Sequence, residues 1–334
     1  MELRGANDDG LNLPAKRDIG IVRRGRALSP SDFWKLADVP PEAEWFANIQ
    51  NKNTRRAYRN DVEEFISFAG IKRPEGLRTV TRPHVIAWRK SLEARELEPA
   101  TIRRKLAALS SLYESLSEAN AVYLNPVDGV ERPKAEANEG KTPALGDAQV
   151  RALLNAPAAD TVKGKRDRAI LATFLYHAIR AEELVGLKVK DIHDRRGVKH
   201  LRIHGKGSKI RFVPLHPAAS ERINEYLEAA GHGEDLNGAL FRPVKNNVTG
   251  DLGNFLTYRG AYQLVKDNAK RAGIEVPGFC VHSTRATAIT NALENGADIA
   301  HVQQWAGHAN ISTTRLYDRR HKRPEDSPTF KVIY

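Results

Sequence analysis

The last quarter of the chain carries residue types suited to phosphate chemistry, in one ordered run. His282 and Arg285 stand three residues apart, then come Gly307, His308 and, nine residues further on, Tyr317. A guanidinium grips a phosphate through two hydrogen bonds, and imidazoles move protons at neutral pH. A tyrosine hydroxyl can attack phosphorus and form a covalent ester. The run therefore suggests an enzyme that cuts and rejoins a nucleic-acid backbone.

Two earlier segments offer the groups that this run lacks. Cleaving a phosphodiester needs a nucleophile, cations for the developing charge, and a proton for the leaving oxygen. Arg180 sits between two expected helices and supplies a second guanidinium. Lys206 lies at a glycine-flanked turn in GKGSKIRFVPL and offers a further cation, with Lys209 in the same segment.

Composition fits a nucleic-acid partner. The 334 residues suffice for two domains and carry 53 Lys and Arg against 41 Asp and Glu, a net charge of +12. This basic excess is spread along the chain, which suits contact with a polyanion, although a merely basic protein is the alternative. The one cysteine excludes an internal disulfide and a cysteine-based zinc site, so we expect a reducing cytoplasm. With no long apolar run we expect no membrane span.

The first part of the chain predicts a helical domain. Residues 1–28 are polar and are expected to form a flexible arm, 29–130 a helical bundle, and 131–142 a charged linker. Helices are expected from Asn53, Thr81 and Pro99, where apolar residues follow at three- and four-residue spacing. Two basic clusters on these helices are candidates for DNA contact, although most charge runs are solvated helix faces. These candidates are Arg55, Arg56, Arg59, Arg103, Arg104 and Lys105.

Residues 143–334 predict a mixed second domain. Asp167 is expected to cap a helix that continues through Leu175, and helices return after about residue 218. Between them, alternating residues predict three short strands, at 189–192, 198–203 and 210–214. The fold class that follows is mainly α with a small antiparallel β-sheet. No cluster with metal-ligand spacing and no nucleotide-phosphate loop is evident, so no cofactor is expected.

These motifs resemble the tyrosine recombinases, the phage integrase family of site-specific DNA recombinases. The matching stretches are R-A-E-E-L, G-K-G-S-K-I-R-F-V-P-L, H-S-T-R, E-N-G-A-D-I and G-H-A-N-I-S-T-T-R-L-Y, in the family's order. They cover about 143–317. Residues 42–130 resemble the family's helical core-binding (SAM-like) domain more loosely, through N-T-R-R-A-Y-R-N-D-V-E-E-F. The resemblance implies that domain followed by a mixed α/β catalytic domain.

The resemblance also implies a role for each matching residue. Arg180 and Arg285 would bind the scissile phosphate and stabilise its pentavalent transition state. Lys206 would protonate the leaving 5′-oxygen, with Lys209 as a rival for that role. Tyr317 would attack to give a 3′-phosphotyrosine, which conserves the bond energy, so that rejoining needs neither metal nor cofactor.

Further positions would support this chemistry. His282 would assist proton transfer at the tyrosine, His308 would hydrogen-bond the phosphate, and Glu183 would orient Arg180 or its helix. The chain departs from the family's usual pattern on both sides of the second arginine, at Thr284 and Ala286. We expect that departure to change how the site is buttressed without removing activity.

The partners implied are double-stranded DNA with inverted half-sites, a homotetramer that exchanges strands through a Holliday junction, and in some settings accessory DNA-binding proteins. The tail, about 318–334, would dock on a neighbouring protomer or pack on its own domain. Localisation would be cytoplasmic, with the nucleoid. Two alternatives stay open: a type IB topoisomerase with a similar residue set, and a DNA-binding regulator that does not cut.

Overall fold

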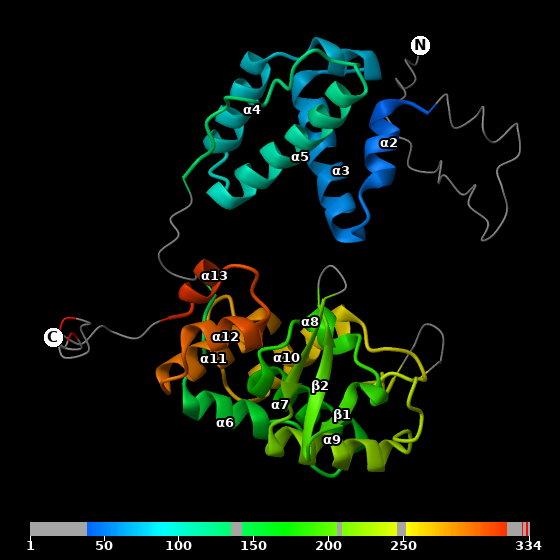
Figure 1. The fold of residues 1–334 in the computed structure, drawn as a ribbon, viewed down its shortest axis with the longest axis vertical. Coiled ribbons are helices and arrows are strands. Elements are labelled where there is room, and N and C mark those ends of the chain that lie inside the picture. Colours follow the sequence, from blue (N-terminus) through cyan, green and yellow to red (C-terminus); the bar gives the residue numbers. More distant parts are fainter. Residues whose placement is uncertain are drawn as a thin grey trace, which may run out of the picture. The chain divides into compact units, whose positions relative to one another are not determined.

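The computed structural model describes residues 39–134, 142–205, 209–245 and 252–318, with positions 329 and 332. The chain divides into two compact units, Met1–Glu136 and Ala137–Tyr334, at a point within the charged stretch 131–142. The arm expected at 1–28, Lys206 and nearly all of the tail lie outside the described residues. Figure 1 shows both units.

The first unit is helical. Its elements are α2 (Pro41–Asn48), α3 (Lys52–Ala69), the 3₁₀ turn η1 (Pro74–Thr79), α4 (Arg82–Ala94) and α5 (Pro99–Glu118). The Asn51 side chain caps α3 by accepting two backbone N–H bonds, and Gly70 ends the helix at a φ of 66°. Phe65 of α3 packs edge-on against Trp88 of α4 in a core that α5 completes.

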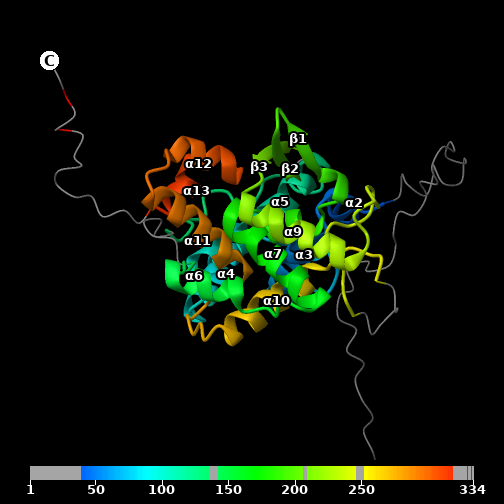
Figure 2. The same ribbon diagram turned by 90° about the horizontal axis from the view of Figure 1, so that it is seen from below.

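The second unit is built around one buried helix. It contains α6 (Asp147–Asn155), α7 (Val162–His177), α8 (Ala181–Val185), α9 (Pro217–Ala230), α10 (Tyr258–Arg271), α11 (Val281–Glu294), α12 (Ile299–Ala306) and α13 (Ile311–Arg315). Helix α7 is buried along most of its length, and α6, α9 and α11 lie beside it (Figure 2). A separate apolar cluster lies under α11 and α12 and includes Tyr317.

A three-stranded antiparallel sheet completes this unit, in the order β1 (Ile192–Arg195), β2 (Val198–His204), β3 (Ile210–Pro214). Leu201 pairs with Val213, and both are buried. Arg196 and Gly197 both adopt positive φ, as a tight β1–β2 hairpin requires. The β2–β3 hairpin closes with a bond of 2.7 Å from Gly205 N to Lys209 O.

Two local predictions were wrong. The strand expected at 189–192 is a 3₁₀ turn, Val189–Asp191, because the Asp191 carboxylate accepts the backbone N–H of Lys188 at 2.9 Å; strand pairing begins only at Ile192. Asp167 does not cap α7. Thr161 does so, while Asp167 is fully buried inside the helix and pairs with Arg166 at 2.6 Å.

The fold class predicted from the sequence is confirmed: a mostly helical chain with one small antiparallel sheet. Across the parts of the chain that the structure describes, we find no helix with the length and apolar character needed to cross a membrane.

Candidate active site and nucleic-acid interface

Arg180 is positioned by the turn between α7 and α8. Ala178 adopts a left-handed φ of 47°, which redirects the chain after α7, and Arg180 is the N-cap of α8. Glu183, one turn into that helix, accepts bonds of 2.9 Å from both the backbone N and the Nη1 of Arg180. Arg180 Nη2 donates to Gly307 O at 3.0 Å. The side chain stays 39% exposed, so part of the guanidinium remains open to a ligand.

Arg285 is the buried guanidinium of the site. It lies in the first turns of α11 and is 1% exposed. Nη1 donates to Ala178 O, and Nη2 donates to Ala306 O at 2.7 Å, so this side chain joins the end of α7 to the end of α12. Burial, and next the charge of Arg180, lower the pKa of Arg285 to about 10. Arg285 therefore remains a cation at neutral pH.

His282 and Tyr317 face each other across the site. His282 Nε2 lies 3.2 Å from Tyr317 Oη. Thr290 of α11 donates to Tyr317 O at 3.1 Å, which fixes the tyrosine backbone. Burial and the charges of Arg285 and Arg180 lower the pKa of His282. Burial raises the pKa of Tyr317, although both arginines oppose that rise. The pair is therefore a neutral phenol beside a neutral imidazole, which can accept its proton.

His308 follows Gly307, whose left-handed φ of 67° ends α12. Its Nδ1 lies 2.9 Å from Thr314 Oγ1, and its ring stacks on Tyr317 with centroids 5.8 Å apart and planes 12° apart. Burial, followed by the charge of Arg285, lowers the pKa of His308 to about 4. The imidazole is therefore neutral near pH 7. When the Thr314 hydroxyl donates to Nδ1, the ring proton lies on Nε2 and is free for a phosphate oxygen.

The structure brings all of these predicted residues together, with Lys206 outside the described residues. Lys209 is exposed at the base of the same hairpin. At the two departures from the family pattern, Thr284 is buried and donates to Val281 O at 2.7 Å. Ala286 is fully buried in the same apolar cluster as Tyr317. Both positions are therefore packed.

Sequence reasoning missed Arg211 on β3. Its Nη1 and Nη2 donate to the two carboxylate oxygens of Glu183 at 2.9 and 2.8 Å, and its Nε donates to Trp305 O at 3.2 Å. One signal was available. Strand alternation puts Arg211 on the same face as buried Val213, and a cation on a core-facing position needs a carboxylate partner.

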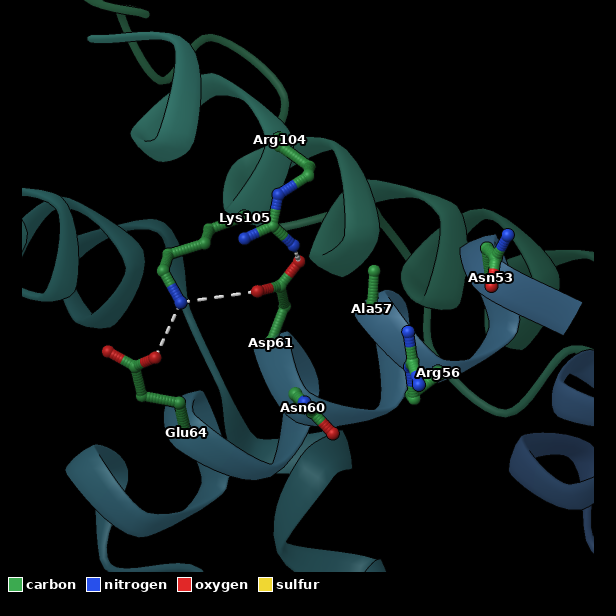
Figure 3. A pocket seen from close by; sticks show the side chains of 8 residues that line it. All are labelled: Asn53, Arg56, Ala57, Asn60, Asp61, Glu64, Arg104 and Lys105. Carbon is green, nitrogen blue, oxygen red and sulfur yellow. Dashed lines mark hydrogen bonds and ion pairs between the residues drawn. The ribbon is translucent and has the colours of Figure 1, made fainter. Parts of the chain in front are cut away.

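The basic cluster on α5 is partly engaged inside its own domain. Lys105 is 7% exposed, and its ammonium lies 3.2 Å from Asp61 Oδ1 and 2.5 Å from Glu64 Oε2 (Figure 3). Arg104 pairs with Asp61 as well. Arg95 reaches Glu64 at 2.6 Å. Burial and this pairing argue against a phosphate contact by Lys105, whose ammonium instead joins α5 to α3.

The cluster on α3 divides in a similar way. Arg55 donates to Ile49 O at 2.8 Å and to Ala47 O at 3.2 Å. The guanidinium of Arg59 lies 4.4 Å from the ring centroid of Phe46. Both side chains therefore hold α2 against α3. Arg56 on α3 and Arg103 on α5 are exposed.

Family models match both units. Residues 144–323 match the model of the phage integrase family, and residues 47–120 match the phage integrase N-terminal SAM-like domain. Tyrosine recombinase XerD of Listeria monocytogenes is 32% identical over 269 residues, which is 79% of this chain and 87% of the relative. Tyrosine recombinase XerC of Herpetosiphon aurantiacus is also 32% identical over 269 residues, which is 79% of this chain and 84% of the relative.

Solved structures share the fold. One is the XerH site-specific recombinase bound to a palindromic difH substrate, a post-cleavage complex, with a TM-score of 0.64, 20% identity, and coverage of 87% of this chain and 81% of that one. Another is a lambda integrase dimer bound to a COC′ core site, with a TM-score of 0.63, 15% identity, and coverage of 90% and 84%. With the site geometry and the family matches, it follows that this chain belongs to the phage integrase family, the tyrosine recombinases, enzymes that break and rejoin DNA.

Proposed function

We propose that this protein is a site-specific DNA recombinase in which Tyr317 is the nucleophile. The observation that carries the proposal is the 3.2 Å contact between His282 Nε2 and Tyr317 Oη, beside the guanidiniums of Arg180 and Arg285. A phenol, a proton acceptor and two cations in one place are the requirements for attack on a phosphodiester. The family relationship supports the same chemistry.

In the proposed reaction, Tyr317 Oη bonds to phosphorus and its proton passes to His282. Arg180 and Arg285 hold the non-bridging oxygens, and His308 donates Nε2–H to one of them. The bond from phosphorus to the 5′-oxygen breaks, and Lys206 supplies the proton that the leaving oxygen takes. The product is a 3′-phosphotyrosine and a free 5′-hydroxyl. Attack by a 5′-hydroxyl on this ester reverses the step, so that rejoining needs no external energy.

The proposed partner is duplex DNA with inverted half-sites. The XerH structure contains a palindromic substrate, and this chain shares the fold of that recombinase. We propose that both units of this chain contact the duplex, that four protomers exchange strands through a Holliday junction, and that the tail, 318–334, docks on a neighbour. Accessory DNA-binding proteins and association with the nucleoid belong to the same proposal.

Phosphate contacts outside the site are proposed for the exposed basic residues, Arg56, Arg103 and Lys209. Arg104 is a weaker candidate, since it pairs with Asp61. Arg55 and Arg59 hold α2 against α3, which gives them a structural role. Lys105 is not proposed as a phosphate contact, because it is buried and pairs with Asp61 and Glu64.

The nucleophile is tested by replacing Tyr317 with Phe. Nicked suicide duplexes, built from DNA sequences that the protein occupies in cells, trap a covalent adduct that denaturing gels resolve. We expect the wild-type protein and a Tyr258→Phe control, which changes an exposed tyrosine of the same unit, to form the adduct. Tyr317→Phe should bind the duplex and form none. An adduct with Tyr317→Phe would rule the assignment out.

The two alternative functions differ in how the wild-type protein behaves. Relaxation of supercoiled DNA without half-site preference would favour a topoisomerase. Tight binding without cleavage would favour a regulator.

The proposed phosphate contacts of the helical unit are tested through the salt dependence of duplex binding. Each phosphate neutralised releases counterions, so that Arg56→Gln and Arg103→Gln should each weaken duplex binding and reduce the slope of log K against log salt concentration by about 1. Lys90→Gln on α4 is the matched control, because it removes an exposed cation from the same unit but from neither basic cluster. Slopes equal to that of wild type in both arginine variants would contradict these contacts.

The neutral state of His308 is tested by NMR titration of the free protein. We expect this imidazole to titrate at about pH 4, since burial and nearby guanidiniums disfavour its protonated form. Arg180→Gln removes one of those cations and should raise the pKa of His308. Arg151→Gln, an exposed change on α6, serves as the control and should not. The His308→Asn variant assigns the signal. Titration at the ordinary pKa of about 6.5 would contradict the desolvated site.

A further inference from the structure

Arg211 joins three segments that each deliver part of the site. It lies on β3, the second strand of the β2–β3 hairpin, and its side chain is 16% exposed. Both carboxylate oxygens of Glu183 on α8 accept from its Nη atoms at 2.9 and 2.8 Å. Its Nε donates to Trp305 O on α12 at 3.2 Å. One side chain therefore connects the hairpin to α8 and to α12.

Glu183 is shared between two arginines. The same carboxylate accepts from the backbone N and the Nη1 of Arg180, each at 2.9 Å. Burial alone would raise the pKa of Glu183, but hydrogen bonds and charge from Arg211 and Arg180 outweigh it and lower that pKa. The carboxylate is therefore ionised. Bidentate pairing of a guanidinium with a carboxylate fixes direction as well as distance.

Gly307 closes the arrangement. A Cβ added at Gly307 would lie 3.1 Å from Arg211 Nη1 and 3.2 Å from its Cζ. The guanidinium therefore packs against the backbone turn that delivers His308, and Gly307 O accepts from Arg180 Nη2 at 3.0 Å. Arg180, Glu183, Arg211 and Gly307 form a closed set of contacts across α8, β3 and the end of α12.

Loss of Arg211 and loss of the Glu183 carboxylate would free different parts of the site. Without Arg211, Arg180 keeps its bonds to Glu183 and to Gly307 O. Strand β3, in contrast, loses its bonds to α8 and to α12 through that side chain. Loss of Arg211 therefore releases chiefly the hairpin, whereas loss of the Glu183 carboxylate releases Arg180 as well.

We propose that Arg211 is a positioning residue that fixes the β2–β3 hairpin relative to Arg180, so that the hairpin's proton donor can reach the leaving 5′-oxygen. This inference rests on the proposed function. It makes Arg211 important for leaving-group protonation and much less important for DNA binding or for attack by Tyr317. A displacement of about 1 Å in a reacting group can cost on the order of 100-fold in rate.

The test compares two leaving groups. In DNA with a bridging 5′-sulfur at the scissile phosphate, Tyr317 Oη bonds to phosphorus, the P–S bond breaks, and sulfur leaves as a thiolate. A thiol has a pKa of about 8.5, far below that of an alcohol, so this substrate does not need the proton donor. Single-turnover cleavage is measured on the sulfur substrate and on ordinary DNA, together with duplex affinity and the thermal midpoint of unfolding.

For Arg211→Gln we expect cleavage of ordinary DNA to fall about 10- to 100-fold, with duplex affinity within about 2-fold of wild type. On the sulfur substrate the rate should return to within a few-fold of wild type. Glu183→Gln should be impaired on both substrates, because it also loosens Arg180. Arg211→Lys keeps the charge without the bidentate pair and should repeat the pattern more mildly, which provides a second variant if Arg211→Gln folds poorly.

The matched control is Arg195→Gln. Arg195 lies on β1 of the same sheet, where it stacks on Phe212 at 4.3 Å from the ring centroid. It should leave both rates unchanged. The inference would be overturned if the Arg211 variants lost cleavage rate equally on both substrates. It would also be overturned if they cleaved ordinary DNA at the wild-type rate. Failure of the proposed function differs from both, since the wild-type protein itself would then form no adduct through Tyr317.

Discussion

The sharing of one carboxylate between two arginines is the interaction on which the candidate site of the second unit depends. Among the side chains that the structure describes, Arg180 and Arg211 both bind the one carboxylate of Glu183. Arg285 is buried and bonds instead to the carbonyl oxygens of Ala178 and Ala306. A buried guanidinium is costly unless its donors are satisfied, and carbonyl oxygens satisfy the donors without neutralising the charge. The site therefore keeps a positive charge after its internal pairs have formed, which suits a phosphate diester.

Burial and the same positive charges together set the protonation of the neighbouring groups. Burial, together with these cations, lowers the pKa values of His282 and His308, so that both imidazoles are neutral near pH 7. Tyr317 is held as a phenol by burial, while the guanidiniums favour its ionised form. Burial and the neighbouring guanidiniums thus produce a neutral base and a neutral phenol beside uncompensated cations. Bound phosphate would relieve the charge repulsion that the free site carries.

The sequence was enough to choose the candidate site residues, which the structure brings together where it describes them, and to predict the fold class. The motifs are local and the periodicity is strong. It failed where a partner lies far away in the chain. Lys105 was a candidate for DNA contact in a basic cluster, yet its carboxylate partners lie on α3, more than forty residues earlier. Arg211 was missed because Glu183 precedes it by 28 residues and meets it only in the folded unit. Asp191 forms a 3₁₀ turn where a strand was predicted, because its carboxylate accepts the backbone N–H of Lys188, a contact that periodicity cannot show.

We propose that this charge-rich site forms a phosphate ester on one tyrosine, Tyr317. The most direct measurement is mass spectrometry of the covalent adduct after proteolysis and nuclease digestion, which identifies both the modified residue and the end of the DNA strand. We expect a peptide that carries its nucleotide on Tyr317 through a 3′-phosphate, with a free 5′-hydroxyl on the other strand end. A nucleotide on any other residue, or a linkage through a 5′-phosphate, would contradict it.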